Sequence, residues 1–106
     1  MNLIQENQER LCEDAINVFG VNSQINMTTE ECGELLSALN KYRRGRVGKD
    51  EVITEIADVI IMCVQLAFYF GYYDTQNEIT HKISRLAQRI TEHELKAQER
   101  VEAATK

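Results

Sequence analysis

Residues 52–70 read VITEIADVIIMCVQLAFYF, the most apolar stretch of this 106-residue chain, and they decide its fold. Apolar side chains recur here at helical spacing in two stripes, one through Ile53 and Ile56 and the other through Val59 and Leu66. A helix that is apolar on nearly every side lies at the centre of a helical assembly. The sequence therefore predicts a central helix packed among others.

Helical periodicity extends to both sides of this segment. The spacing of Thr28 and Glu31, and of Thr75 and Glu78, is typical of an N-terminal capping box, and Asp50 suits the N-cap of the central helix. The expected helices cover about residues 2–19, 28–43, 51–70 and 76–94, with residues 21–27 as a loop.

These helices predict an all-α fold. The chain has no proline, which suits long helices joined by short turns. We expect one domain over residues 1–106, a four-helix antiparallel bundle with residues 95–106 as a frayed or interface helix end. The central helix has more apolar surface than three short partners can cover, so we expect oligomerisation to complete the bundle.

Composition narrows the classes of function. With 17 acidic and 12 basic residues the net charge is −5, which argues against general nucleic-acid binding.

Cys12, Cys32 and Cys63 form no CxxC pair and lie in apolar helical patterns, so we expect reduced core thiols in a cytoplasmic protein. Residues 1–10 lack the apolar segment of a signal peptide. The apolar window 59–73 is shorter than the ~20 residues that span a bilayer, which predicts a buried helix and no membrane partner.

Acidic residues fall on the two central helices at helical spacing. Because a helix turns about 100° per residue, Glu31 and Glu34 lie side by side at the margin of an apolar face, whereas Glu30 points further toward solvent. Glu55 and Asp58 lie one turn apart, in the narrow polar gap of the apolar helix. Two such pairs on adjacent helices can bring four carboxylates together.

Four clustered carboxylates repel one another unless a cation compensates their charge. Oxygen ligands of this kind select Mg²⁺ or Mn²⁺, and Mg²⁺ also binds substrate phosphates. In the alternative interpretation, Glu31 and Glu34 form a solvated helix edge, while Glu55 and Asp58 pair with lysine or arginine from a neighbouring helix.

Residues 30–34 read EECGE and residues 55–58 read EIAD. Together they resemble the EExxE…ExxD signature of the MazG-like all-α nucleoside triphosphate pyrophosphohydrolases. Gln24 is similar to a position common in that family, and residues 82–85, KISR, are similar to the Lys/Arg motif of its last helix. The resemblance covers about residues 20–90.

The resemblance implies Mg²⁺-dependent cleavage of (deoxy)nucleoside triphosphates between the α and β phosphates, giving a monophosphate and pyrophosphate in a house-cleaning role. It implies that Glu31, Glu34, Glu55 and Asp58 are catalytic residues that ligate Mg²⁺, or Mn²⁺ in its place. Glu30 is the first acid of the signature and is expected to be catalytic; its angular position makes it either a residue that supports the ligands from outside or a base that orients water. Members of the family form homodimers or homotetramers, often with sites completed by a neighbouring chain.

Substrate-binding residues are expected mainly on the last helix. Lys82 and Arg89 lie on one flank of its apolar face, while Arg85 lies further round and is supported by the resemblance. The family often has an arginine where this chain has Leu86, so Arg85 and Arg89 remain alternatives for the phosphate contact. Gln24 is the fourth expected substrate-binding residue.

Two other functions remain open. A non-catalytic helical interaction module would show no Mg²⁺ dependence. Phosphoribosyl-ATP pyrophosphohydrolase belongs to the same superfamily, although the basic and glycine features associated with it are not evident here. A di-iron centre is not favoured. It needs an ExxH motif on each of two helices, and only Glu78 and His81 have that spacing.

Overall fold

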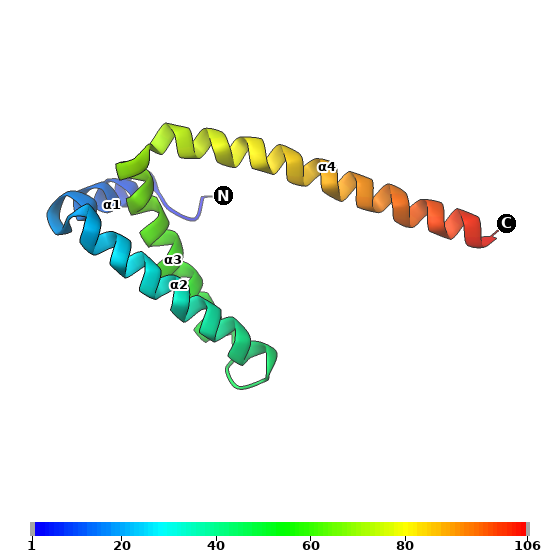
Figure 1. Ribbon diagram of the computed structural model, residues 1–106, viewed down its shortest axis with the longest axis horizontal. Coiled ribbons are helices and arrows are strands. Elements are labelled where there is room, and N and C mark those ends of the chain that lie inside the picture. The colour runs from blue at the N-terminus through cyan, green and yellow to red at the C-terminus, as the bar shows by residue number, and fades with distance from the viewer. Residues whose placement is uncertain (1, 106) are drawn as a thin grey trace. The chain divides into compact units, whose positions relative to one another are not determined.

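The computed structural model describes residues 2–105 as α-helices joined by short turns (Figure 1). The helices of this range are α1 (Glu6–Phe19), α2 (Val21–Arg43), α3 (Lys49–Phe70) and α4 (Tyr72–Thr105). No strand occurs among residues 2–105, so the predicted all-α class with four helices is confirmed.

The chain divides into two compact units after Tyr72. The first unit contains α1, α2 and α3, and the second consists of nearly all of α4. The expectation of a single domain over residues 1–106 stays a prediction.

In the first unit, α3 packs against both α1 and α2. Its apolar core is small, with Cys12 and Ile16 from α1, Ala38 from α2 and Met62 from α3 as the buried hydrophobic residues described. Helices of this length owe most of their stability to such packing rather than to intrinsic propensity. The site described below lies along the contact between α2 and α3.

The second helix begins earlier than the sequence predicts. α2 starts at Val21, directly after Gly20, so the expected loop over residues 21–27 is wrong. Gly20 makes the sharp turn from α1 with φ +87°, a conformation that glycine adopts without steric cost. Thr28 is therefore inside a helix, and its hydroxyl donates to the Gln24 carbonyl at 2.7 Å instead of capping an N-terminus.

The other helix starts also differ from the expected caps. Gly48, not Asp50, is the N-cap of α3. α4 begins at Tyr72, so Thr75 lies within the helix and does not start it. α4 continues as helix to Thr105, beyond the point near residue 94 where the apolar pattern thins, and α1 begins at Glu6 instead of residue 2.

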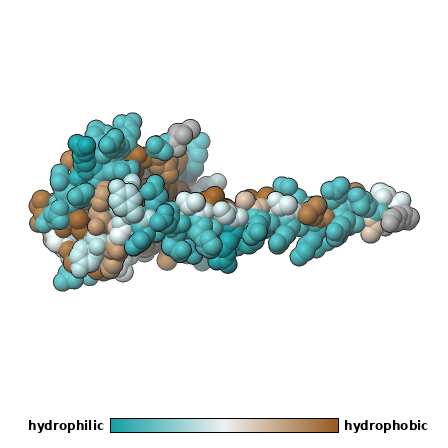
Figure 2. Space-filling view, turned by 90° about the horizontal axis from the view of Figure 1, so that it is seen from above, coloured by the Kyte–Doolittle hydropathy of each residue, from teal (hydrophilic) through white to brown (hydrophobic). Residues whose placement is uncertain are grey.

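α3 is less buried in this unit than the sequence predicts. Its buried residues are Met62 and Gln65, whereas Ile53 and Ile61 are exposed. Figure 2 shows hydrophobic side chains between hydrophilic ones on the visible face of the α1–α3 unit. At 22 residues, α3 is also long and apolar enough to cross a membrane by length and composition, a test that core helices of soluble proteins also pass.

The cysteines correct another expectation. All three are free thiols, but only Cys12 is buried, while Cys32 and Cys63 are exposed. Burial and the nearby Cys32 raise the pKa of Cys63, so these two thiols lie near each other on α2 and α3. Two of the three are therefore surface thiols and not core residues.

Candidate metal centre

The candidate site lies between α2 and α3, which run antiparallel. Near the start of α2, Gln24 donates a hydrogen bond from Nε2 to Oε1 of Gln65, close to the end of α3, at 2.6 Å. Further along α2, Glu34 approaches Glu55 in the first half of α3. These two pairs of neighbouring residues show the direction and the register of the helix pair.

The residues of α2 that face α3 follow a seven-residue interval. Gln24 and Ala38 are buried and Glu31 is half-buried, whereas Glu30 is exposed. Seven residues make about two helical turns, so Gln24, Glu31 and Ala38 share one face. A glutamate therefore occupies the middle of the helix contact, in a position where an apolar residue is normally found.

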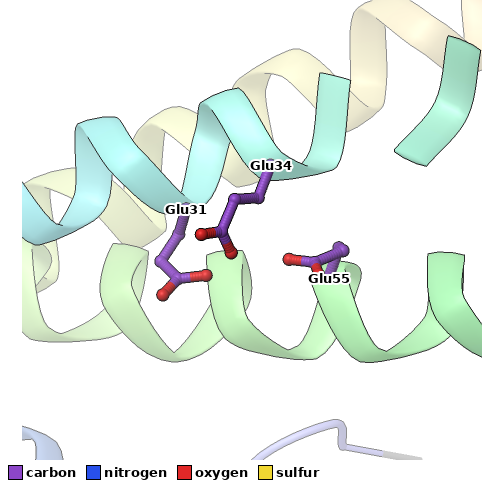
Figure 3. Close-up of side chains that lie close together, drawn as sticks. All are labelled: Glu31, Glu34 and Glu55. Carbon is purple, nitrogen blue, oxygen red and sulfur yellow. The ribbon is translucent and has the colours of Figure 1, made fainter. Parts of the chain in front are cut away.

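Three carboxylates meet in this contact. Glu31, Glu34 and Glu55 each offer one oxygen, and these oxygens lie within 4.8 Å of one another. Figure 3 shows Glu31 and Glu34 reaching from α2 toward α3, with the Glu55 carboxylate turned toward that of Glu34. Glu31 and Glu55 are half-buried and Glu34 is exposed, so the cluster is open to solvent on the Glu34 side.

The cluster raises the pKa of two of its members. For Glu31, loss of hydration is the largest cause, followed by the negative charges of Glu34 and Asp58. Loss of hydration is also the largest cause of the raised pKa of Glu55, again followed by Glu34 and Asp58. Like charges in a partly desolvated site favour the protonated form. Without a cation, the ionised carboxylates of the cluster therefore repel one another.

Two oxygens of the cluster have no hydrogen-bond partner. Glu31 Oε2 and Glu55 Oε2 are both shielded from solvent and unpaired. Within the described part of the α1–α3 unit, the ion pair found is Arg10–Glu6 at 3.8 Å, and none involves the cluster. Among the described residues of this unit, the salt bridges of the alternative interpretation are therefore not found.

The donor set fits a divalent cation. Shielded and unpaired carboxylate oxygens are costly, and a cation would satisfy both of them and offset the repulsion. An all-oxygen set suits Mg²⁺ or Mn²⁺ rather than softer metals. Glu31, Glu34 and Glu55 are thus the residues best placed to hold such an ion.

The two other predicted acids lie differently. Asp58 is half-buried on α3, and its charge raises the pKa of both Glu31 and Glu55, so it borders the cluster without belonging to the three-residue group. Glu30 is exposed on α2 and lies outside this group.

Gln24 is buried between α2 and α3. Its side chain is 6% exposed, and its amide nitrogen is bound to Gln65. The structure gives Gln24 an interhelical contact, and its role in substrate binding stays a prediction. Sequence reasoning missed its pairing with Gln65, although a lone glutamine within the apolar stretch 52–70 was the available signal.

The predicted basic residues belong to the other unit. Lys82, Arg85 and Arg89 are exposed on α4. Their roles as phosphate contacts stay predictions.

Comparison with known proteins identifies the family to which the chain belongs. A search of curated proteins finds no significant match, and neither does a search of solved structures. A scan against protein-family models matches residues 19–92 to the MazG nucleotide pyrophosphohydrolase domain. This match spans α2 and α3 with all five predicted acids, as well as residues 72–92 of α4. The chain therefore belongs to the MazG nucleotide pyrophosphohydrolase family.

Proposed function

We propose that the protein is a Mg²⁺-dependent nucleoside triphosphate pyrophosphohydrolase that converts (d)NTP and water to (d)NMP and pyrophosphate in a house-cleaning role. Membership of the MazG family supports nucleotide pyrophosphohydrolase activity in general. The observation that carries the proposal is the Glu31, Glu34 and Glu55 cluster, with two shielded oxygens that lack partners.

The acids have separate roles in this proposal. Glu31, Glu34 and Glu55 hold the ion, and Asp58 at the border of the cluster completes the ligand set. When bound, Mg²⁺ supplies positive charge that offsets the phosphate oxygens and lowers the pKa of the attacking water. Glu30 is exposed and directly precedes Glu31 in the sequence. In this proposal Glu30 orients the attacking water and accepts its proton.

The proposed reaction breaks the bond between the α-phosphorus and the oxygen that bridges it to the β-phosphorus. The water oxygen forms a bond to the α-phosphorus, the bond from that phosphorus to the bridging oxygen breaks, and pyrophosphate leaves with the electron pair. Lys82 with Arg85 or Arg89 on α4 supplies charge to the β and γ phosphates in this proposal, since exposed basic side chains suit a polyanion.

Assembly belongs to the same proposal. The exposed Ile53 and Ile61 leave apolar area on α3 that a homodimer or homotetramer would cover. The free thiols are compatible with a reducing cytoplasm. An acidic chain with a net charge of −5 gives little support to nucleic-acid binding.

The test measures both products from each NTP and dNTP. The full-length protein is incubated with Mg²⁺, with Mn²⁺ and with a chelator, and pyrophosphate and monophosphate are quantified separately. We expect equimolar products with either metal and none with the chelator. Release of inorganic phosphate with a diphosphate would instead indicate attack at the γ-phosphorus.

Variants connect the activity to the cluster. Glu34→Gln and Asp58→Asn remove one negative charge each with little change in shape, and we expect both to lose most of the activity. Glu13→Gln is the matched control, because Glu13 is exposed on α1, outside the cluster. Activity in the two cluster variants at the level of the control would exclude the proposed site.

A further inference from the structure

Gln24 and Gln65 form a buried amide pair between α2 and α3. Each is 6% exposed, and they are the buried polar residues found in the described chain. Gln24 Nε2 donates to Gln65 Oε1 at 2.6 Å, and Gln65 Nε2 contacts the Met62 sulfur at 3.7 Å. Both amides are thus engaged inside the helix contact.

The pair lies on the same helix faces as the carboxylates. Gln24 precedes Glu31 by two turns on α2, and Gln65 follows Asp58 by two turns on α3. At 1.5 Å per residue, Gln24 lies about 10 Å from Glu31 along α2, and Gln65 lies about 15 Å from Glu55 along α3. A slip of one helix by a single turn, about 5 Å, would separate Glu34 from Glu55.

Apolar contacts define this register weakly. The hydrophobic effect is non-directional and scales with the apolar area buried, so it distinguishes poorly between registers that bury similar areas. A hydrogen bond between two buried amides is satisfied in one register only. In helix pairs, a single buried polar contact is the best-attested device that specifies register.

We propose that the hydrogen bond between Gln24 and Gln65 fixes the register of α2 against α3 and so holds Glu31 and Glu34 opposite Glu55. Gln24 and Gln65 are then positioning residues, since their side chains contact each other and Met62 and lie outside the group of three carboxylates. The inference rests on the proposed function insofar as the carboxylate cluster is taken to bind Mg²⁺.

Stability and positioning can be separated by mutation. Gln24→Leu or Gln65→Leu alone leaves a buried amide unpaired, which lowers stability. Replacing both by leucine removes both polar groups and keeps their volume, so the double variant is expected to be at least as stable as a single one and close to wild type. The double variant therefore tests register in a folded protein.

The experiment uses three readouts on the full chain. Thermal unfolding in chelator reports stability, and calorimetric titration with Mg²⁺ alone reports metal affinity. Nitroxide labels on the exposed Cys32 of α2 and Cys63 of α3 report the helix register by electron paramagnetic resonance, with the buried Cys12 protected. Dilution with unlabelled protein removes signals between chains.

We expect the Gln24→Leu/Gln65→Leu protein to unfold near the wild-type temperature, to bind Mg²⁺ at least about tenfold more weakly and to show a shifted or broadened distance between the labels. Thr28→Val is the matched control. Thr28 is half-buried on the same face of α2, but its hydroxyl bonds within its own helix. We expect this variant to keep the wild-type affinity and distance.

An unchanged label distance or an unchanged Mg²⁺ affinity in the double variant overturns the inference. Failure of the proposed function has a different signature, because wild-type protein would then neither bind Mg²⁺ nor release pyrophosphate. In that case the label distance alone decides whether the amide pair sets the register.

Discussion

Glu34 on α2 raises the pKa of Glu55 on α3, and among the causes only the loss of hydration of Glu55 itself is larger. The two residues thus repel each other across the helix contact on which the fold depends. A cation that stabilises the cluster would also stabilise the α2–α3 pair. The stability of the α2–α3 pair should therefore depend on the charge of these carboxylates and on divalent metal.

Glu34→Gln should stabilise the metal-free protein while abolishing its response to metal. The substitution removes repulsion with Glu31 and Glu55 but also removes a ligand. We expect a rise of a few degrees in melting temperature in chelator and no further rise when Mg²⁺ is added. Calorimetry with and without Mg²⁺ measures both. A fall in chelator would mean that Glu34 has a stabilising partner.

The pH dependence of metal-free stability should carry the signature of Glu31 and Glu55. Their folded-state pKa values lie above the ordinary value of 4.5, so the folded protein binds more protons than the unfolded chain between those values. Their contribution is fully present below pH 4.5 and is lost as the pH rises through the folded pKa.

Urea unfolding in chelator from pH 4 upward measures this dependence. Glu31→Gln should show a flatter loss of stability with pH than wild type, because one of the two groups no longer titrates. With Mg²⁺ the sign should reverse, since the ion binds the deprotonated carboxylates. A wild-type profile parallel to that of Glu31→Gln would contradict the raised pKa.

Tyr72→Phe should destabilise the α1–α3 unit without affecting the metal. The Tyr72 hydroxyl donates to Glu9 Oε2 at 2.9 Å, while its ring stacks on Phe68 at 4.7 Å between centroids. Phenylalanine keeps the stacking and loses the hydrogen bond, for an expected cost of about 1 kcal/mol. Urea unfolding measures the loss, with Tyr42→Phe at an exposed site as control. Equal stability of the two variants would contradict the prediction.

Ile53→Glu should weaken self-association. Ile53 is 56% exposed on α3, and a charge there would oppose burial against a second chain. We expect sedimentation velocity to show a shift toward monomer for this variant and none for Val18→Glu, which places the same charge on the exposed face of α1. Circular dichroism confirms that both variants remain helical.

Periodicity was sufficient to predict the helices and the carboxylate faces, because both follow from local geometry. It placed Glu31 and Glu34 on one side of a helix and Glu55 on a facing one, and the structure brings these three together. It failed over residues 21–27, where Asn22 and Ser23 look like loop residues although no proline stops the helix.

Tertiary contacts explain what periodicity missed. Gln24 was assigned to substrate binding from its similarity to a family position, and its burial depends on Gln65, which lies far away in sequence. The exposure of Cys32 and Cys63 likewise depends on which side of each helix meets its neighbour. Such pairings are properties of the packed unit and not of any single helix pattern.

The short connection between α2 and α3 has a consequence for how the protein folds. All four predicted ligands lie between Glu31 and Asp58, on two consecutive helices joined by residues 44–48. Contacts between such neighbours close small loops, which cost little entropy and form early. We therefore expect the carboxylate cluster to assemble as a local helical hairpin in the first stage of folding. Divalent ions present during refolding should then accelerate it by screening the repulsion within that hairpin.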